Sequence, residues 1–158
     1  MIAPALFSSR SEEWETPQTL FERLDSEFHF TLDACATALN AKCRKYFDKQ
    51  TDGLAQNWSG QRVFINPPYG AEIGRWMEKA RTAAEEGALV VCLVHARTDT
   101  RWWHQNVEGK ASEVRFIKGR LKFERKGKSG VSAPFPSVIV IYRPVRSEIK
   151  ARRSASAV

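Results

Sequence analysis

Leucine, phenylalanine and small apolar residues recur along the chain at spacings that predict alternating helices and strands. A stripe of leucine and phenylalanine predicts a helix over residues 17–28, and a second apolar stripe predicts a helix that begins after Gly70 and stops at Gly87. The run ALVVCLVHA, residues 88–96, is apolar throughout, which is typical of a strand covered on both faces.

Weaker patterns complete the predicted elements. Strands are predicted at residues 30–35, 62–66, 113–118, 120–124 and 137–142, and further helices near residues 40–47 and 100–110. This alternation predicts an open, mostly parallel α/β sheet in a single compact domain. The last strands follow one another too closely for crossover helices, so we expect an antiparallel pair at one edge.

The two ends of the chain differ in composition from the middle. Residues 1–13 are small and polar and are expected to form a disordered arm, and residues 144–158 are expected to form a basic, flexible tail. The folded domain is therefore predicted at residues 14–143. Thr16 and Pro17 predict the start of its first helix, with Thr16 at the N-cap and Pro17 in the first turn.

Composition limits the class of protein. A chain of 158 residues, 42% of them hydrophobic, has the length and apolar content of one globular domain. The sequence contains neither an apolar run of about eighteen residues nor the pattern of a secretory signal, so no membrane association is expected. Three cysteines without CxxC spacing argue against a zinc site or a disulfide framework, so we expect no metal and a cytoplasmic location.

The charge of the chain favours a polyanionic partner such as DNA. The net charge is +7 and the pI is about 9.6, and Lys and Arg gain affinity by releasing counterions from phosphates. Candidate phosphate contacts are Arg97, after the long apolar strand, and Lys118, Arg120 and Lys122 in the stretch KGRLKFERKGK. The structural alternatives are a helix cap beside Arg97 and a solvated hairpin for the basic stretch.

Polar groups follow three of the apolar strands, at Asp33, Asn66 and His95. In open α/β sheets, ligands bind beyond the carboxyl ends of the strands. We therefore expect the functional site where these three strand ends meet.

The stretch VFINPPYG, residues 63–70, ends its strand with a motif suited to binding an amine. Pro67 keeps Asn66 extended, and neither Pro67 nor Pro68 has an N–H donor, so a side-chain oxygen and a backbone oxygen stand on a stiff frame. Two fixed acceptors suit an NH₂ group, and Tyr69 adds a flat face on which a planar ring can stack. An exocyclic amine on an aromatic base fits this description, and such acceptors would also stabilise positive charge that grows on the amine nitrogen when it attacks an electrophile.

Each of these residues also has a purely structural interpretation. The two prolines can stiffen a turn, and Asp33 can cap a helix or form a salt bridge instead of binding a ribose hydroxyl or an ammonium group of a cofactor. Asp52 precedes a glycine and can belong to an ordinary turn. Trp14 can cover the core instead of lining an adenosine pocket.

Several segments together resemble one family. They are WETP at 14–17, LDACA at 32–36, NAKC at 40–43, GL at 53–54 with Trp58, VFINPPYG at 63–70, ARTDT at 96–100 with WWH at 102–104, and APFPS at 133–137. This set resembles the phage-type DNA N6-adenine methyltransferases, the Dam-like family, over most of the chain. NPPY by itself also occurs in enzymes that methylate glutamine side chains in proteins.

The resemblance implies a Rossmann-like methyltransferase fold that uses S-adenosylmethionine and acts on DNA. It implies that Asn66, Pro67 and Pro68 hold the target N6 and that Tyr69 stacks on a base flipped out of the duplex. The cofactor-binding residues that it implies are Trp14, Thr16, Pro17, Asp33, Ala34, Cys35, Asp52 and Asn66.

Two features depart from the family pattern. No glycine lies between Asp33 and Gly53, where a glycine-rich loop is usual. The chain leaves no room for a separate target-recognition domain, so we expect low sequence specificity. Two alternative functions remain at this stage: methylation of a glutamine amide in a protein, and non-catalytic binding of nucleic acid. The sequence predicts no particular oligomeric state.

Overall fold

The computed structural model describes residues 14–125 and 128–145. The predicted N-terminal arm, residues 1–13, and residues 146–158 of the predicted tail lie outside the described residues. The beginning of the predicted tail contacts the domain, because the Val145 N–H donates to the Ala84 carbonyl (3.0 Å).

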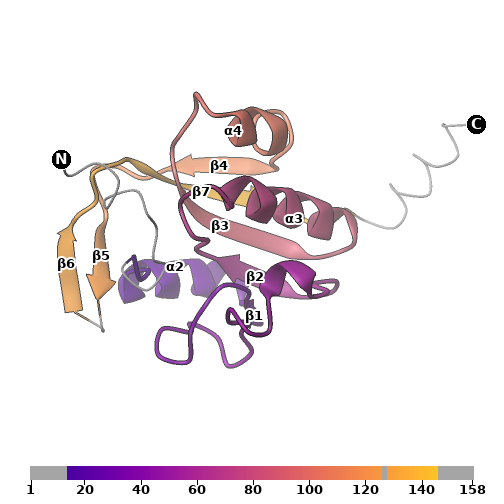
Figure 1. The fold of residues 1–158 in the computed structure, drawn as a ribbon, viewed down its shortest axis with the longest axis horizontal. Helices are drawn as coiled ribbons and strands as arrows, with labels where there is room; N and C mark the ends of the chain where they lie inside the picture. The colour runs from indigo at the N-terminus through magenta and orange to yellow at the C-terminus, as the bar shows by residue number, and fades with distance from the viewer. Residues whose placement is uncertain (1–13, 126–127, 146–158) are drawn as a thin grey trace, which may run out of the picture.

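A five-stranded mixed sheet forms the centre of the molecule (Figure 1). Its strands, in spatial order, are β1 (Leu32–Asp33), β2 (Arg62–Ile65), β3 (Leu89–His95), β7 (Ser137–Tyr142) and β4 (Glu113–Phe116). β1, β2 and β3 are parallel, whereas β7 pairs antiparallel with both β3 and β4. The predicted α/β fold, mostly parallel with an antiparallel pair at one edge, is confirmed.

Helices cover both faces of this sheet. α2 (Gln18–Phe28) packs on one face, where the Phe21 ring meets Phe64 of β2 with centroids 5.2 Å apart. α3 (Ile73–Glu85) packs on the other face, with α4 (Arg101–Asn106) beside it (Figure 1). Every residue of β3 is buried between these layers, as its apolar run predicts. No helix in the described ranges is long and apolar enough to cross a membrane.

The start of α2 corrects one prediction. Pro17, not Thr16, occupies the N-cap position, and it makes no side-chain capping hydrogen bond. The Thr16 hydroxyl is buried and accepts a hydrogen bond from Asn66 instead. Threonine is a favourable N-cap residue, but Thr16 binds the Asn66 side chain instead of capping α2.

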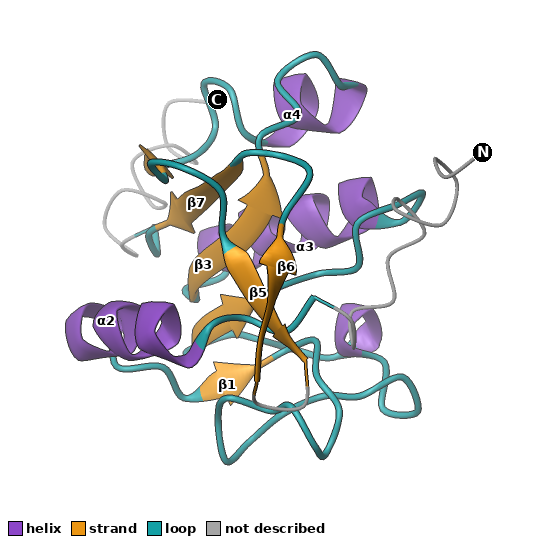
Figure 2. Cartoon of the chain, turned by 90° about the vertical axis from the view of Figure 1, so that its left-hand side faces the viewer, coloured by secondary structure: helices purple, strands orange, loops and turns teal. Residues whose placement is uncertain are grey.

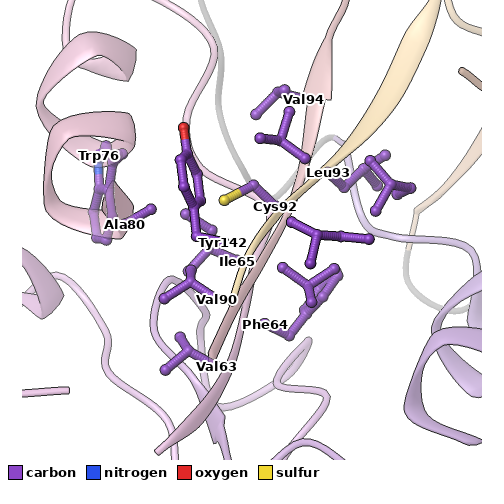
Figure 3. Packing of buried hydrophobic residues seen from close by; sticks show 14 of the residues in the cluster. Val63, Phe64, Ile65, Trp76, Ala80, Val90, Cys92, Leu93, Val94 and Tyr142 are labelled. Atoms are coloured by element: carbon purple, nitrogen blue, oxygen red, sulfur yellow. The ribbon is translucent and has the colours of Figure 1, made fainter. Parts of the chain in front are cut away.

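The core between α3 and the sheet is built from alternate strand residues. Figure 3 shows Trp76 and Ala80 of α3 facing the side of the sheet that carries Val90 and Cys92, whereas Leu93 points to the opposite side. This follows from the two-residue period of a strand. Cys92 is thus a buried thiol in the core, as expected from its apolar neighbours.

A separate two-stranded hairpin stands at the carboxyl end of the parallel strands. It consists of β5 (Lys122–Arg125) and β6 (Lys128–Ser132) and links β4 to β7. Figure 2 looks onto this hairpin, which lies in front of the five-stranded sheet. The strand predicted at 120–124 therefore forms outside the main sheet. β6 has no counterpart in the prediction, because KSGVS lacks an alternation of apolar residues.

The segment between β1 and β2 differs most from expectation. The helix predicted near residues 40–47 is wrong: this stretch forms turns and then runs alongside β1. The Asp33 N–H donates to the Lys45 carbonyl (3.0 Å), and the Phe47 N–H donates to the Asp33 carbonyl (3.0 Å). Backbone groups that a helix would pair internally are paired with the strand. A short 3₁₀ helix, Gly53–Ala55, follows.

Candidate active site

The Asn66 side chain follows the end of β2, and its amide hydrogens are bound by the N-terminal segment. Nδ2 donates to the Trp14 carbonyl (2.6 Å) and to the Thr16 hydroxyl (3.1 Å). The amide oxygen Oδ1 accepts no hydrogen bond from any residue in the described ranges. The amide is therefore held with its donor end occupied and its acceptor end available.

The prolines after Asn66 supply a second acceptor. Neither ring nitrogen carries a hydrogen, and within residues 14–125 and 128–145 the Pro67 carbonyl accepts no hydrogen bond. Pro67 is buried and Pro68 is half-buried. The Asn66 side chain and the Pro67 backbone thus each carry an acceptor oxygen without a partner in the described residues.

The N-terminal segment that binds Asn66 is itself anchored to the hairpin. Glu15 and Glu124 of β5 exchange two backbone hydrogen bonds (3.2 and 2.9 Å). The Glu124 carboxylate also accepts from the Gln18 N–H at the start of α2 (2.9 Å). The position of the Asn66 amide therefore depends on contacts with β5.

A small pocket, the polar pocket, opens beside Asn66. Its volume is about 20 Å³, room for about one water-sized group. It is lined by Glu15, Thr16, Asp33, Cys35, Asn40, Lys42, Phe64 and Asn66. The fold thereby brings together four of the predicted site residues, Thr16, Asp33, Cys35 and Asn66, from three separate segments of the chain.

Asp33 is the buried acid of the polar pocket. It is 3% exposed, and its carboxylate accepts from the backbone N–H groups of Lys42 (3.0 Å) and Cys35 (3.4 Å). Burial raises the pKa of Asp33 to about 7, against the lowering effect of these two hydrogen bonds. A buried acid with a perturbed pKa beside a pocket is typical of a ligand site.

A larger cavity, the outer pocket, shares Cys35 with the polar pocket and has a volume of about 260 Å³. It is lined by Cys35, Ala36, Thr37, Phe47, Asp48, Lys49, Asp52, Gly53, Leu54, Pro68, Glu72, Arg75 and Trp76. Asp52, a predicted cofactor residue, has a left-handed backbone (φ 52°), and its carboxylate accepts from the Leu54 N–H (3.2 Å). The Trp76 Nε1–H is buried and has no hydrogen-bond partner in the described part of the chain.

Gly53 provides close backbone contact at the end of β1, where the family pattern has a glycine-rich loop. A Cβ atom at this position would lie 2.1 Å from the Ala34 carbonyl oxygen and 3.1 Å from the Trp76 ring. Only glycine allows the two chain segments to approach this closely. Ala34, a predicted cofactor residue, is fully buried beneath this contact and lines neither pocket.

Tyr69 belongs to an aromatic cluster made of Trp14, Tyr69, His95, Phe123 and Phe135. Its ring stacks on His95, with centroids 4.7 Å apart and planes 20° apart, and meets Phe135 nearly at right angles at 5.4 Å. Its hydroxyl donates to the Leu93 carbonyl (3.2 Å). Burial raises the pKa of Tyr69 well above its usual range, so the hydroxyl stays protonated.

The aromatic cluster limits the access of a base to the Tyr69 ring. Tyr69 is 4% exposed, and one face of its ring is covered by His95. Burial also lowers the pKa of His95 to about 4, so the covering imidazole is neutral at pH 7. Stacking of a flipped base on Tyr69 stays a prediction, and it requires rings of the cluster to separate.

The family model for DNA N-6-adenine-methyltransferase (Dam) matches residues 5–158 of the chain. The chain belongs to the Dam family. The family predicted from the sequence segments is therefore confirmed.

Two relatives of this Dam-family chain are similar over shorter stretches. A DNA N-6-adenine-methyltransferase of Escherichia phage T1 is 27% identical over 110 residues, which cover 68% of this chain and 45% of the phage protein. YfdM of Escherichia coli strain K12, which carries a provisional methyltransferase name, is 34% identical over 65 residues, 37% of this chain and 71% of YfdM. The aligned part thus spans less than half of the phage T1 protein.

The predicted DNA contacts of this Dam-family chain lie on the surface. Lys118, Arg120 and Lys122 are exposed where the chain enters β5, and none of them forms an ion pair with another described residue. Arg97 is partly exposed and lies 3.8 Å from the Asp99 carboxylate. Arg115 on β4, by contrast, is bound through two 2.7 Å hydrogen bonds to Glu27.

Not all predicted cofactor residues line a pocket. Pro17 lies at the start of α2, and the Trp14 ring packs on Phe123 and Phe135 at 5.3 and 5.5 Å. The Trp14 ring is therefore part of the aromatic cluster and packs against the core, the structural alternative for its side chain, while its carbonyl accepts a hydrogen bond from Asn66.

Other residues enter the site without having been assigned a role from the sequence. They are Glu15, Asn40 and Lys42 in the polar pocket, and Phe123 and Phe135 around Tyr69. His95, which stacks on Tyr69, belongs to the third strand end at which the site was expected. Asn40, Lys42 and Phe135 lie in segments that carry the Dam-family resemblance, which is the signal that points to them.

Proposed function

We propose that this chain transfers a methyl group from S-adenosylmethionine to N6 of adenine in DNA. The observation that carries the proposal is the Asn66 amide, whose N–H groups are bound by the Trp14 carbonyl and the Thr16 hydroxyl. This leaves its oxygen available as an acceptor, and the next residue, Pro67, supplies a second acceptor in its carbonyl group. Membership of the Dam family supports the same class of reaction.

The reaction needs an amine nitrogen that is more nucleophilic than adenine N6 in a free base. The N6 lone pair is delocalised into the ring. If Asn66 Oδ1 and the Pro67 oxygen each accept one N6 hydrogen outside the ring plane, the nitrogen becomes more tetrahedral and its lone pair more available. Both oxygens would then also stabilise the positive charge that develops on N6 as the N–C bond forms. The bond between the methyl carbon and the sulfonium sulfur would break in the same step, and its electron pair would leave on the sulfur of S-adenosylhomocysteine. Neither oxygen is basic enough to remove a proton first, so the N6 proton leaves to water after transfer.

The polar and outer pockets are the proposed cofactor site. S-adenosylmethionine, when bound, supplies an electrophilic sulfonium methyl group. The buried Asp33 would accept a hydrogen bond from a ribose hydroxyl or the ammonium group, and Asp52 would contact the nucleoside end. Acids suit a ligand with two positively charged groups.

DNA would be held largely through its phosphates, with low sequence specificity. Lys118, Arg120 and Lys122 form an exposed basic group at the entrance to β5. They follow β4, whose carboxyl end lies at the same edge of the sheet as that of β2, which Asn66 follows. Charge contacts of this kind position a duplex without reading its sequence.

The deciding experiment is transfer of labelled methyl groups from S-adenosylmethionine to random-sequence duplex DNA, followed by nucleoside analysis. Wild type should yield N6-methyladenine, and Asn66→Ala should lower the rate by about 10²–10³-fold. Asn57→Ala is the matched control, because Asn57 is an exposed amide whose oxygen accepts a hydrogen bond from the Ser59 backbone N–H. Its rate should equal that of wild type.

Three results would contradict the proposal. Label found on a protein glutamine would indicate methylation of a glutamine amide instead of adenine. An unchanged rate in Asn66→Ala would exclude activation of N6 by the Asn66 oxygen. Absence of S-adenosylmethionine binding in calorimetry, together with binding of DNA, would indicate a non-catalytic nucleic-acid-binding domain. Label confined to one long, strict recognition sequence would contradict low specificity alone.

A further inference from the structure

We infer that Thr16 is a positioning residue for Asn66, and that the Trp14 carbonyl makes position 66 selective for an amide over a carboxylate. The inference rests on the proposed function, in which Asn66 Oδ1 accepts an N6 hydrogen. It assigns Thr16 a role in the orientation of the acceptor, in place of the cofactor contact that the family resemblance implies.

The orientation of the Asn66 amide decides whether it can bind an amine. The two ends of an amide are similar in size but opposite in hydrogen bonding: one accepts and the other donates. A rotated amide would present its own NH₂ to the substrate NH₂, and two donors cannot pair. Only the observed orientation, with Nδ2 toward the Trp14 carbonyl and the Thr16 hydroxyl, leaves an acceptor for the substrate.

The two partners of Nδ2 act differently. A backbone carbonyl can only accept, whereas a hydroxyl can accept or donate. The Trp14 carbonyl, 2.6 Å from Nδ2, therefore requires an N–H at this place, and the Thr16 hydroxyl occupies the second N–H. Thr16 is 3% exposed and Asn66 9%, so water does not readily replace either partner.

A carboxylate at position 66 would make an unfavourable contact with these two groups. One of its oxygens would take the place of Nδ2 and face the Trp14 carbonyl oxygen with no hydrogen between them. The Thr16 hydroxyl can turn and donate, but the Trp14 carbonyl cannot. Protonation of the acid would restore a donor toward Trp14 and a carbonyl oxygen toward the substrate.

The partners of Asn66 are preorganised by the elements around them. Glu15, between Trp14 and Thr16, is paired through its backbone with Glu124 of β5, and Gln18 just beyond is bound by the Glu124 side chain. Site residues held by such supporting contacts keep their geometry during reaction. The segment 14–16 is therefore fixed between the two groups that orient the amide, at Glu15, and just after them, at Gln18.

Thr16→Val and Thr16→Ser, assayed for methyl transfer to DNA, test the positioning role. Valine keeps the shape and removes the hydroxyl, so we expect kcat to fall about tenfold, while KM for S-adenosylmethionine stays within about twofold. Serine restores the hydroxyl and should restore kcat. A raised KM for S-adenosylmethionine with unchanged kcat in the valine variant would assign Thr16 to the cofactor and overturn the inference.

Asn66→Asp tests the selectivity for an amide. Relative to wild type at the same pH, we expect its kcat to be about 10²-fold lower at pH 8 and to recover partly as the pH falls toward 6 and the new acid is protonated. Activity close to wild type at pH 8, or a ratio to wild type that does not change with pH, would overturn the selectivity.

A measurement that needs no activity separates this inference from the proposed function. In ¹⁵N-labelled protein, the Asn66 side-chain NH₂ signals, identified by their loss in Asn66→Ala, should exchange slowly with water in wild type and at least about tenfold faster in Thr16→Val. Equal exchange in the two proteins would overturn the positioning role. Absence of DNA methylation by wild type would refute the proposed function alone.

Discussion

The two sides of residues 66–69 are built in different ways. On the Asn66 side, hydrogen bonds of defined direction hold an amide, a buried acid and the N-terminal segment around the polar pocket. On the Tyr69 side, rings stack and cross at centroid distances of 4.7 to 6.4 Å, and Tyr69 has little exposed surface.

This difference indicates which side of residues 66–69 is already formed before a ligand binds and which side has to rearrange. Directional hydrogen bonds lose much of their value when partners shift, whereas ring contacts can be exchanged for contacts with another ring. We therefore expect the cofactor side to be largely formed beforehand and the base side to open when DNA binds. The predictions below address this contrast in order of decreasing effect.

Removal of the Tyr69 ring should have the largest effect. Tyr69→Ala deletes a buried side chain at the centre of the aromatic cluster, and we expect the free energy of unfolding to fall by about 3–5 kcal/mol. Tyr69→Phe keeps the ring and loses only the bond to the Leu93 carbonyl, which should cost about 1 kcal/mol. Urea unfolding measures both. A small loss for Tyr69→Ala would show that the cluster is already open in solution.

Asp33 should make the stability of the polar side depend on pH. Burial raises its pKa from an ordinary 3.8 to about 7. The folded state therefore favours the neutral acid. The resulting stabilisation, worth about 4 kcal/mol, is complete below about pH 4 and is lost as the pH rises through about 7.

Urea unfolding of wild type and Asp33→Asn between pH 5 and 8 checks this pH dependence. Asparagine cannot ionise, so the free energy of unfolding of wild type should decline with rising pH relative to that of the variant. Curves that stay parallel over this range would show that the carboxyl is not desolvated as described.

Gly53→Ala tests the close contact between the outer pocket and the end of β1. The new Cβ would lie 2.1 Å from the Ala34 oxygen, so the backbone must shift, at a cost of about 1–3 kcal/mol. Affinity for S-adenosylmethionine, measured by calorimetry, should fall with it. Gly74→Ala is the control, because its Cβ would meet only the Trp102 Cβ, at 3.4 Å. A variant with wild-type affinity would separate this contact from the cofactor site.

The basic residues at the entrance to β5 should have the smallest effects. Lys118→Ala and Arg120→Ala should each weaken DNA binding by less than about 1 kcal/mol at moderate salt and lower the slope of log affinity against log salt by about 1. Lys110→Ala, which removes an exposed lysine from the turn between α4 and β4, should leave the slope unchanged. Fluorescence anisotropy at several salt concentrations measures these slopes. Slopes that do not change in either variant would place the phosphate contacts elsewhere.

Local patterns were sufficient to predict the sheet, the helices that cover it and the motif at Asn66. The apolar run of β3 and the stripes of α2 and α3 are periodic because each element is buried in one piece. The two acceptors at Asn66 and Pro67 are equally local, because proline chemistry acts on adjacent residues.

The groups that complete the site could not be predicted in this way. The partner of Asn66 is the backbone carbonyl of Trp14, and a carbonyl carries no sequence signal. The turns at residues 40–47 replace a helix because their backbone pairs with β1, a tertiary contact that outweighs local propensity. Tyr69 was expected to be open because its ring partners, Phe123 and Phe135, lie far along the chain.

The hydrogen bonds between residues 14–18 and β5 also imply that the site forms late in the folding of the chain. The hydrogen bonds of Asn66 to Trp14 and Thr16 close loops of 52 and 50 residues, and the bond from Gln18 to Glu124 closes one of 106. Contacts of such separation form slowly, because the chain between them must first be ordered. During synthesis, residues 66–69 leave the ribosome well before β5 does. The nascent chain therefore contains its amine-binding motif for some time before β5, the strand that sets the orientation of Asn66, has been synthesised. The site is complete only when the last third of the chain has packed against the rest.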